Sequence, residues 1–458
     1  MIEVQIAGAG AGKTYGLAGS LIDHIKTCSS HKKTFALTYT NTATSKIEQE
    51  IIKQHGCIPP NLCIQTVHSF LLNEIIYPFS SFTLGDVYND ASIMILPNDA
   101  RYKNGLFKRL RERNIIHAEN VYNIAKQIVD ETVSKHNSRA KRTKVQRLLA
   151  IIESCFEKVF IDEVQDLDSD ALRIFEVLGS NGIDVYMIGD PKQAIKYPKA
   201  LDAFINKISE QEYATVFDIN NETRRVPTEI LTVSNRFCYE DQQQVSLSGI
   251  VGELMYIESI DARYEELLNG YIDSKQIVCI DKKSGRYSTS SKHKYSFPRE
   301  VEDLIRDSNH KKDKVLFAKA AFADFMDDVA TNDARRAINK LITKHSLTLE
   351  GHHFAQLYEL CAKCTEGNVQ FKVQSIDSVK GLDADTCVVI ISPNILKYLV
   401  KKNLGRAEYF NKEWKRVYVA LTRAKRRLIL ALDHELLVGV DMMVVRDSIG
   451  VLGFVYHD

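Results

Sequence analysis

A glycine-rich loop near the start of the chain constrains the fold more than any other feature. The residues Ala7-Gly8-Ala9-Gly10-Ala11-Gly12-Lys13-Thr14 follow a short apolar run, Glu3–Ile6, and precede a helical pattern that begins at Tyr15. Strand, loop and helix in this order are typical of a phosphate-binding loop, whose glycines let the backbone N–H groups turn toward phosphate. We expect Lys13 to reach the β- and γ-phosphates of a nucleotide and Thr14 to bind Mg²⁺.

Two later strands end in polar residues that suit the same chemistry. Val159–Ile161 leads into Asp162 and Glu163. We expect Asp162 to hold Mg²⁺ and Glu163 to act as the general base on the attacking water. Val185–Ile188 leads into Gly189-Asp190-Pro191-Lys192-Gln193. Gln193 could sense the γ-phosphate, although Gly-Asp-Pro also suits a plain turn.

Short apolar runs alternate with helical patterns at both ends of the chain, which predicts an α/β fold with two parallel-sheet assemblies. The runs predicted as strands are Glu3–Ile6, Thr34–Tyr39, Leu62–Gln65, Lys158–Ile161, Asp184–Ile188, Gln276–Ile280, Lys314–Ala318, Phe371–Ile376, Thr386–Ile391 and Arg427–Leu432. Residues 71–154 interrupt the first assembly and are predicted to be mostly helical. Residues 284–312 are polar and predict an exposed loop or insertion.

The composition is that of an ordinary globular protein. The 458 residues are 45% apolar and 26% charged, and no apolar run approaches the roughly 18 residues that cross a membrane. Nine cysteines, an odd count in a long chain, favour reduced thiols in the cytosol over a disulfide framework. We therefore expect a cytoplasmic protein with no membrane partner. One CxxC, Cys361-Ala362-Lys363-Cys364, is too little for a zinc site, and His352-His353 favours packing or surface over ligation.

The net charge of +1 conceals one strongly basic segment. Residues 101–147 contain 13 Lys or Arg and only four acids. Such a segment is either a solvated helical surface or a track for a nucleic-acid backbone. Its four clustered cations, Arg139, Lys141, Arg142 and Lys144, are the candidates for backbone contact.

These motifs, in this order, resemble those of the UvrD/Rep-like superfamily 1 helicases. Besides the three segments above, the resemblance rests on Thr40-Asn41, Thr66-Val67-His68, Thr223-Arg224-Arg225-Val226-Pro227, Lys380-Gly381-Leu382-Asp383 and Val417-Tyr418-Val419-Ala420-Leu421-Thr422-Arg423-Ala424. It implies two RecA-like motor domains with ATP and Mg²⁺ in the cleft between them and single-stranded DNA across their top. RNA is not excluded.

The resemblance also implies domain boundaries. The first motor domain would comprise residues 1–70 and 155–213, with a helical accessory insertion at 71–154. The second would comprise residues 214–458, with a polar insertion near 284–312 and the family's large second accessory domain reduced or absent.

The same resemblance implies roles for individual residues. Arg225 and Arg423 would reach the γ-phosphate, with Arg224 as a rival for Arg225, and Asp383 would contact the nucleotide. The residues implied to contact DNA are Thr40, Asn41, Thr66, His68 and Tyr197. Movement along the strand would run 3′ to 5′.

Three features depart from the family pattern. Asp377 stands where a histidine usually precedes the lysine-glycine motif. Tyr197, Pro198 and Lys199 follow Gln193 where the family has an aromatic-arginine pair, so Tyr197 either stacks on a base or lies in a turn. Only six residues precede the phosphate loop, which leaves no counterpart for the family's adenine-reading glutamine.

A narrower resemblance suggests the biological setting. Thr66–Phe70 followed by Glu74–Phe79 is similar to the helicase-like subunits of Gabija anti-phage defence complexes. This implies an ATP-driven DNA translocase or helicase that serves as the ATPase subunit of a complex whose nuclease, of topoisomerase-primase type, is a different polypeptide. The alternatives are a nucleic-acid-gated ATPase sensor without strand separation, and a stand-alone DNA repair helicase.

Overall fold

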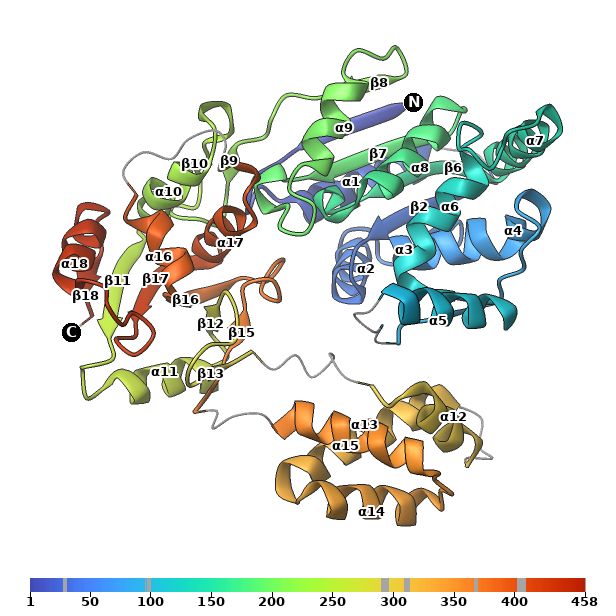
Figure 1. The fold of residues 1–458 in the computed structure, drawn as a ribbon. Helices are drawn as coiled ribbons and strands as arrows, with labels where there is room; N and C mark the ends of the chain where they lie inside the picture. Colours follow the sequence, from blue (N-terminus) through green and yellow to red (C-terminus); the bar gives the residue numbers. More distant parts are fainter. Residues whose placement is uncertain are drawn as a thin grey trace. The chain divides into compact units, whose positions relative to one another are not determined.

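The computed structural model describes residues 1–458 apart from 28–30, 95, 97–99, 290–295, 309–313, 366–369, 402–408 and 458. It divides into two compact units (Figure 1). The first comprises Met1–Ser92, Asn104–Gly285 and Val373–Asp458, and the second comprises Ile93–Lys103 and Arg286–Lys372.

The first unit contains two six-stranded sheets in which every strand pair is parallel. The first sheet has the order β3-β2-β6-β7-β1-β8. Its strands are β1 (Ile2–Ile6), β2 (Lys33–Thr38), β3 (Leu62–Thr66), β6 (Phe156–Ile161), β7 (Asp184–Gly189) and β8 (Ala214–Val216). The prediction of an α/β protein with two parallel sheets is confirmed.

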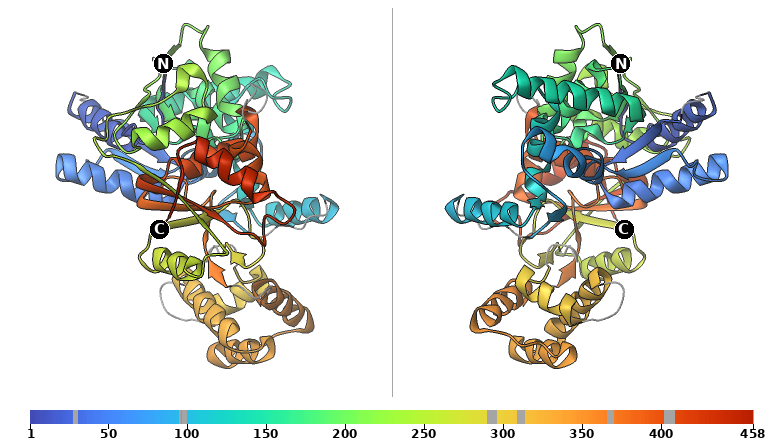
Figure 2. Two further views of the ribbon diagram at one scale, coloured as in Figure 1. Left: turned by 90° about the vertical axis from the view of Figure 1, so that its left-hand side faces the viewer. Right: turned by 90° about the vertical axis from the view of Figure 1, so that its right-hand side faces the viewer.

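Helices cover both faces of the first sheet, because its central strands are apolar on both sides. Ala36 and Phe160 point toward α1 (Lys13–Thr27) and α2 (Asn41–His55), which lie side by side (Figure 2). Their chain neighbours, among them Phe35 and Val159, point to the other face and pack with α8 (Ser169–Ser180) and α9 (Ala200–Ile208).

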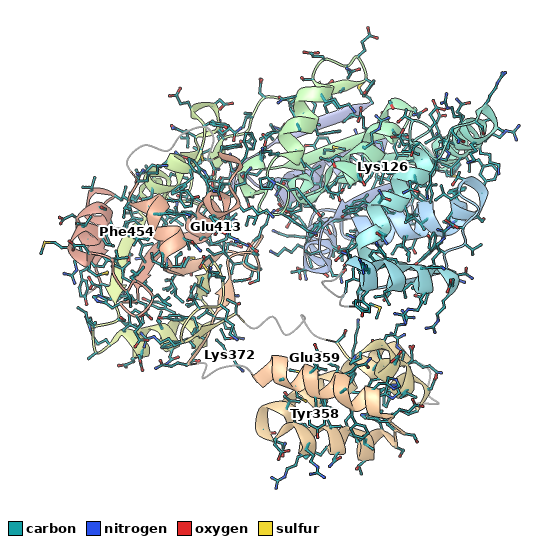
Figure 3. The ribbon with its side chains drawn as sticks, in the orientation of Figure 1. Lys126, Tyr358, Glu359, Lys372, Glu413 and Phe454 are labelled. Atoms are coloured by element: carbon teal, nitrogen blue, oxygen red, sulfur yellow. The ribbon has the colours of Figure 1, made fainter. Side chains whose placement is uncertain are left out.

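The interval between β3 and β6 is mostly helical, as the sequence predicts. It contains α3 (Val67–Phe70), a π-helix (Leu71–Ile76), α4 (Tyr77–Thr83), β4 (Asp90–Ser92), α5 (Ala100–Glu112), β5 (Ile115–His117), α6 (Val121–Val129) and α7 (Arg139–Cys155). Apolar residues of α6 and α7 join the core of the first sheet. Lys126 of α6, labelled in Figure 3, pairs with Asp170 of α8 at 2.5 Å. This ion pair connects the inserted helices to a helix that packs on the first sheet.

The second sheet has the order β15-β12-β16-β17-β11-β18. Its strands are β11 (Glu253–Glu258), β12 (Ile277–Ile280), β15 (Gln374–Ser375), β16 (Ala384–Ile390), β17 (Ala424–Leu432) and β18 (Val455–Tyr456). The other elements of this region are β9 (Glu222–Thr223), α10 (Thr228–Ser234), β10 (Val245–Ser246), α11 (Tyr264–Asp273), α16 (Pro393–Leu399), α17 (Lys412–Leu421) and α18 (Met442–Val451). Their shared core includes Trp414 and Phe454 (Figure 3).

The second unit is mostly helical; it corrects one prediction and adds a helix to the segment predicted as a loop or insertion. It contains β13 (Tyr287–Ser288), α12 (Arg299–Asp307), α13 (Lys314–Thr331), α14 (Ala334–His345), α15 (Gly351–Thr365) and β14 (Phe371–Lys372). The predicted strand Lys314–Ala318 is wrong, because these residues are the first turns of α13. The polar segment 284–312 is likewise not all loop: Val301 and Ile305, four residues apart on α12, are fully buried in the core of this unit, and residues 290–295 and 309–313 lie outside the described part.

In the part of the chain that the structure describes, no helix is both long enough and apolar enough to span a lipid bilayer.

Candidate nucleotide and nucleic-acid sites

The phosphate loop leaves the carboxyl end of β1 and runs into α1. Gly10 and Gly12 have φ angles of 73° and 75°, a region that favours glycine. Lys13 is the first residue of α1, and its Nζ donates hydrogen bonds to the carbonyls of Ala7 (3.3 Å) and Gly8 (3.1 Å). The ammonium charge is thereby held inside the curve of the loop, at the amino end of a helix, which is a favourable place for phosphate.

Asp162 and Glu163 follow β6, close to the start of α1. The Thr14 hydroxyl donates to Asp162 Oδ2 at 3.3 Å. Burial, reinforced by the neighbouring Glu163 carboxylate, raises the pKa of Asp162 to about 7. Burial acts on Glu163 in the same direction, but the charges of Lys13 and Lys380 offset it and hold the pKa of Glu163 below its usual range. Glu163 is therefore the ionised member of the pair, as a general base requires.

Glu163 is also held in a specific orientation. Its φ of 54° is left-handed, an uncommon backbone conformation that concentrates at functional sites. Gln165 Nε2 donates to Glu163 Oε2, and Gln165 Oε1 accepts a hydrogen bond from the backbone N–H of Asp190 at 2.9 Å. The sequence motifs gave no role to Gln165, which here ties the candidate base to the end of β7.

The residues present fit a magnesium ion. The Thr14 hydroxyl and the Asp162 carboxylate are hard oxygen donors of the kind Mg²⁺ prefers, and a cation bound beside Asp162 would favour the ionised form of this buried acid. When bound, Mg²⁺ would neutralise charge on the phosphate oxygens. Thr14 and Asp162 are the side chains that would hold it.

Gln193 joins the two sheets of the first unit. It lies in a short 3₁₀ turn after β7, and its Nε2 donates to Asp190 Oδ2 at 3.0 Å. Its Oε1 accepts a hydrogen bond at 3.3 Å from Arg423, which precedes β17 of the second sheet. The Arg423 guanidinium is buried, and it also donates to the carbonyls of Val419 and Leu382.

Arg224 and Arg225, the two rivals, point in different directions. Arg224 is exposed. Arg225 turns toward the phosphate loop: a Cβ placed on Gly10 would lie 2.7 Å from Arg225 Cβ. The Arg225 guanidinium donates to the carbonyl of Thr422 at 3.0 Å. Burial, together with the charge of Arg423, lowers the pKa of Arg225 to about 9. Two neighbouring buried guanidinium groups favour a polyanion nearby.

Asp383, which the family resemblance assigns to nucleotide contact, forms an ion pair in this structure. Its carboxylate forms an ion pair with Lys425 at 2.6 Å. Nearby, the Lys46 ammonium of α2 donates to the carbonyl of Gly381 at 2.7 Å, and Lys380 pairs with Asp166 at 2.5 Å. The lysine-glycine motif therefore bridges the two sheets, and the described residues give Asp383 a structural partner.

Thr40 lies two residues after β2 and Thr66 is the last residue of β3, two strands near the edge of the sheet opposite to β1 and its phosphate loop. Thr40 Oγ1 accepts from the N–H of Ala43, and Thr66 Oγ1 accepts from the N–H of Ser69, each at 3.2 Å. Both are N-caps, which begin α2 and α3. Asn41, the first residue of α2, is exposed.

His68 and Tyr197 belong to one cluster of aromatic side chains and a cation. His68 lies 3.3 Å from the hydroxyl of Tyr122, and its ring is in edge contact with Tyr39. The Lys196 ammonium donates to the Tyr39 hydroxyl at 2.6 Å and lies over the ring of Tyr197. Burial, with a smaller contribution from Lys196, lowers the pKa of His68, so this histidine offers a neutral ring and not a cation.

The candidate cations of the basic segment are surface residues. Arg139, Lys141, Arg142 and Lys144 occupy the first turns of α7, and all four are exposed. Lys141 and Arg142 donate to nearby backbone carbonyls. Within the described part of the chain, none of the four forms an ion pair with an acidic side chain.

Asp377, the departure in the lysine-glycine motif, has a partner of matching chemistry. Arg416 of α17 donates to both of its carboxylate oxygens, at 2.9 and 2.7 Å. The pair lies at the entrance to α17, the helix that leads to Arg423. An acid here is thus compensated by an arginine within the same sheet region.

One group of three metal-ligand side chains occurs among the described residues, namely Glu300, His352 and His353 in the second unit. The backbone N–H of Glu350 donates to His353 Nδ1 at 3.0 Å. Neutral His353 then carries its proton on Nε2, the atom that faces Glu300, and a protonated nitrogen cannot ligate a metal. The packing interpretation of these histidines is preferred. Cys361 is buried, and the side chain of Cys364 lies outside the described part.

Comparison with known proteins agrees with this geometry. A family model described as an AAA domain matches residues 2–198. The chain is 24% identical over 503 residues to Gabija protein GajB of Bacillus cereus strain VD045, covering 94% of this chain and 92% of that protein. The UvrD/Rep-like resemblance is confirmed. These two matches support a helicase-like, ATP-hydrolysing enzyme.

A solved structure described as a complex of Arterivirus nonstructural protein 10 (helicase) with DNA also matches, at 10% identity and a TM-score of 0.36. The match covers 94% of this chain but only 60% of that one. A TM-score this low does not relate the two folds.

Proposed function

We propose that this UvrD/Rep-like chain is an ATP-driven translocase on single-stranded DNA, moving 3′ to 5′, and that it serves as the ATPase subunit of an anti-phage nuclease complex. One observation carries the motor part of the proposal. Gln193, after a strand of the first sheet, accepts a hydrogen bond from the buried Arg423 of the second. A γ-phosphate sensor and a cis-acting arginine that touch across two sheets suit hydrolysis coupled to relative movement of those sheets.

The proposed catalytic roles follow from the contacts described above. Lys13 and the loop from Ala7 to Thr14 bind the phosphates, and Thr14 with Asp162 holds Mg²⁺. Glu163 accepts the proton of the attacking water. Arg225 and Arg423 stabilise negative charge as the terminal phosphate is transferred.

The proposed path of DNA lies over the carboxyl ends of β2 and β3. The cluster of Tyr39, His68, Tyr122, Lys196 and Tyr197 combines aromatic faces with a cation, as base stacking on a single strand requires. Binding of the DNA backbone by the exposed cations of α7 would add a salt-dependent grip. Interactions of this kind do not distinguish DNA from RNA.

The proposed partnership rests on the likeness to Gabija protein GajB over 94% of the chain. We expect a separate nuclease subunit of topoisomerase-primase type to supply DNA cleavage. Gene neighbours co-expressed with this chain should include a protein that forms a complex of defined mass in size-exclusion chromatography with light scattering.

The motor proposal is tested by ATP turnover with and without single-stranded DNA, and by displacement of streptavidin from biotin at either end of an oligonucleotide. We expect DNA to stimulate turnover and streptavidin to be displaced from the 5′ end only. Stimulation without displacement from either end would favour the sensor that gates its ATPase on nucleic acid. Protection of DNA by a strictly monomeric chain would favour the repair helicase.

A further inference from the structure

Gln244 reaches the phosphate loop from the other motor sheet. It precedes β10, and its backbone is fixed by Asn235, whose Oδ1 accepts from the Gln244 N–H at 2.8 Å and whose Nδ2 donates to the Gln244 carbonyl at 2.9 Å. The side chain is 3% exposed. Its Nε2 donates to the carbonyl of Ala9, inside the loop, at 2.9 Å.

The loop is shaped to admit this side chain. A Cβ placed on Gly8 would lie 2.4 Å from Gln244 Nε2, closer than non-bonded atoms approach. Position 8 must therefore be glycine, because any side chain there would collide with Gln244. At position 10 glycine is also favoured by the positive φ angle. The conformation of the loop and the position of the Gln244 amide are thus coupled.

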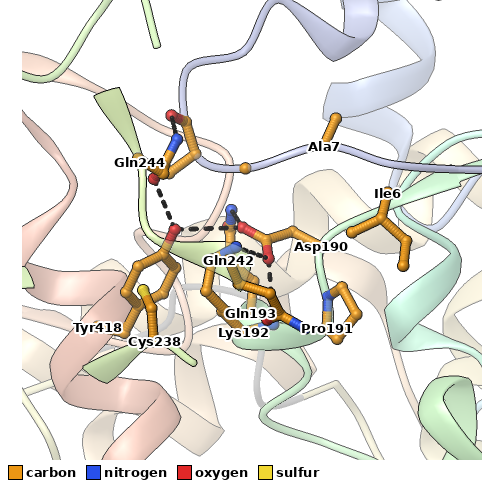
Figure 4. A network of polar contacts seen from close by, with 12 residues as sticks. Ile6, Ala7, Asp190, Pro191, Lys192, Gln193, Cys238, Gln242, Gln244 and Tyr418 are labelled. Atoms are coloured by element: carbon orange, nitrogen blue, oxygen red, sulfur yellow. Dashed lines mark hydrogen bonds and ion pairs between the residues drawn. The ribbon is translucent and has the colours of Figure 1, made fainter. Parts of the chain in front are cut away.

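The other end of the Gln244 amide meets a shared hydroxyl proton (Figure 4). Tyr418, fully buried on α17, lies with its hydroxyl 2.8 Å from Gln244 Oε1 and 3.3 Å from Asp190 Oδ2. Burial, together with Asp190, keeps the pKa of Tyr418 well above its usual value, so the hydroxyl retains its one proton. A single proton cannot serve two acceptors fully, and the shorter distance favours Gln244.

Asp190 continues the chain of contacts to the arginine. The same Oδ2 that faces Tyr418 accepts from Gln193 Nε2, and Gln193 Oε1 accepts from Arg423. Tyr418 and Gln193 share this one carboxylate oxygen, so a stronger hydrogen bond from Tyr418 draws on its negative charge and weakens the bond from Gln193. Where the Tyr418 proton goes therefore affects how firmly Asp190 holds Gln193.

We propose that Gln244 is a positioning residue that links the conformation of the phosphate loop to the placement of Arg423, through Tyr418, Asp190 and Gln193. When the Ala9 carbonyl accepts from Gln244, the amide is held so that its oxygen accepts the hydrogen bond of the Tyr418 hydroxyl. When the loop turns that carbonyl away, the amide is released, the Tyr418 hydroxyl donates to Asp190 instead, and the contacts of Gln193 and Arg423 are loosened. The relay rests on the proposed ATPase and adds to it a route by which one sheet reports to the other.

The test is a double-mutant cycle on ATP turnover by the full chain in the absence of DNA. Gln244→Ala and Tyr418→Phe should each lower kcat about tenfold, while the Kd of a fluorescent ATP analogue changes by less than about threefold. Because both changes interrupt one relay, the double variant should be no slower than about twofold below the slower single variant. Gln243→Ala, at an exposed neighbouring position, is the matched control and should retain the wild-type kcat.

Losses that multiply in the double variant, or a weakened Kd with unchanged kcat, would overturn the relay while leaving the motor proposal intact. A wild-type chain that hydrolyses no ATP would overturn both. Tyr418→Phe keeps the shape of the ring, so it tests the hydroxyl even if Gln244→Ala does not fold.

Discussion

The candidate nucleotide site and the basic start of α7 both carry charge, but the two regions hold that charge in opposite ways. Asp190, Gln193 and Arg423 are at most 2% exposed and bonded to one another. The α7 cations, from Arg139 to Lys144, are exposed. In a buried polar network the loss of one partner is costly, because the group left behind has no water to replace it, whereas surface cations are hydrated, mobile and screened by salt. Changes in the first region should abolish an activity, and changes in the second should only tune one.

The sharpest test of the buried region is Glu163→Gln. The amide cannot accept a proton from water, so turnover should fall by about a hundredfold to ten-thousandfold while ATP still binds.

Lys13→Ala should also abolish hydrolysis, because no other cation lies within the loop. Steady-state ATPase and equilibrium binding measure the two effects. Glu210→Gln, an exposed glutamate on the same sheet region, is the control, and near wild-type turnover by Glu163→Gln would refute the assignment of the base.

A second test uses two neighbouring arginines that differ in burial. Arg225→Lys should lower kcat about a thousandfold, the lower end of the effect of an arginine that stabilises phosphoryl transfer, because lysine lacks the planar guanidinium that can bond the Thr422 carbonyl and a phosphate at the same time. Arg224→Lys, at an exposed position, should stay within about twofold of wild type. Equal losses in the two variants would show that burial does not identify the catalytic arginine.

The parts of the nucleotide site that lie within single motifs can be predicted from the sequence. The loop from Ala7 to Thr14 and the pair Asp162-Glu163 each combine a short strand with adjacent polar residues, a local pattern visible without a structure. The bond between Tyr418 and Gln244 spans 174 positions. Tyr418 belongs to the last motif, but Gln244 lies in none, and nothing in the sequence links the two. Such partners are brought together only by the packing of the two sheets.

The wrong strand prediction in the second unit and the helix α12, which the sequence did not predict, have a related cause. The run from Lys314 to Ala318 is short, and a short apolar run fits a strand or a buried helix equally well. In α12, charged residues surround Val301 and Ile305, so the composition conceals the helical spacing of its two buried residues. Both helices could have been found from the spacing of apolar residues along a whole helix, but not from the amino-acid composition of a segment.

The exposed region is tested by removing the charges of Arg139, Lys141, Arg142 and Lys144 together. Binding to single-stranded DNA should weaken, and the salt dependence of the binding constant should flatten by about 0.7 in log–log slope for each phosphate that the segment no longer neutralises. Fluorescence anisotropy across a salt series measures the slope. The basal ATPase should not change.

A matched control for this variant lies on α14 of the second unit. Arg335, Arg336, Lys340 and Lys344 are also exposed, but three of them pair with nearby aspartates. Neutralising these four residues should leave the salt dependence of DNA binding at its wild-type slope. If the α7 variant kept that slope as well, its cations would be only a solvated surface.

His68 provides the smallest test, because it belongs to the candidate DNA surface yet is partly buried like the nucleotide residues. Burial and Lys196 lower its pKa in the folded protein from 6.5. Between the lowered value and 6.5 the unfolded chain binds more protons, so this contribution to stability is present above pH 6.5 and is lost as the pH falls. Thermal melts of His68→Phe should therefore lose less in Tm than the wild type between pH 7.5 and 5.5, by on the order of 1–2 °C in a chain of this size. His31→Phe, at an exposed histidine, should follow the wild type. If the Tm of His68→Phe fell with pH as steeply as that of the wild type, the His68 ring would be as exposed to solvent as the α7 cations. His68 would then belong with the exposed region and not with the buried one.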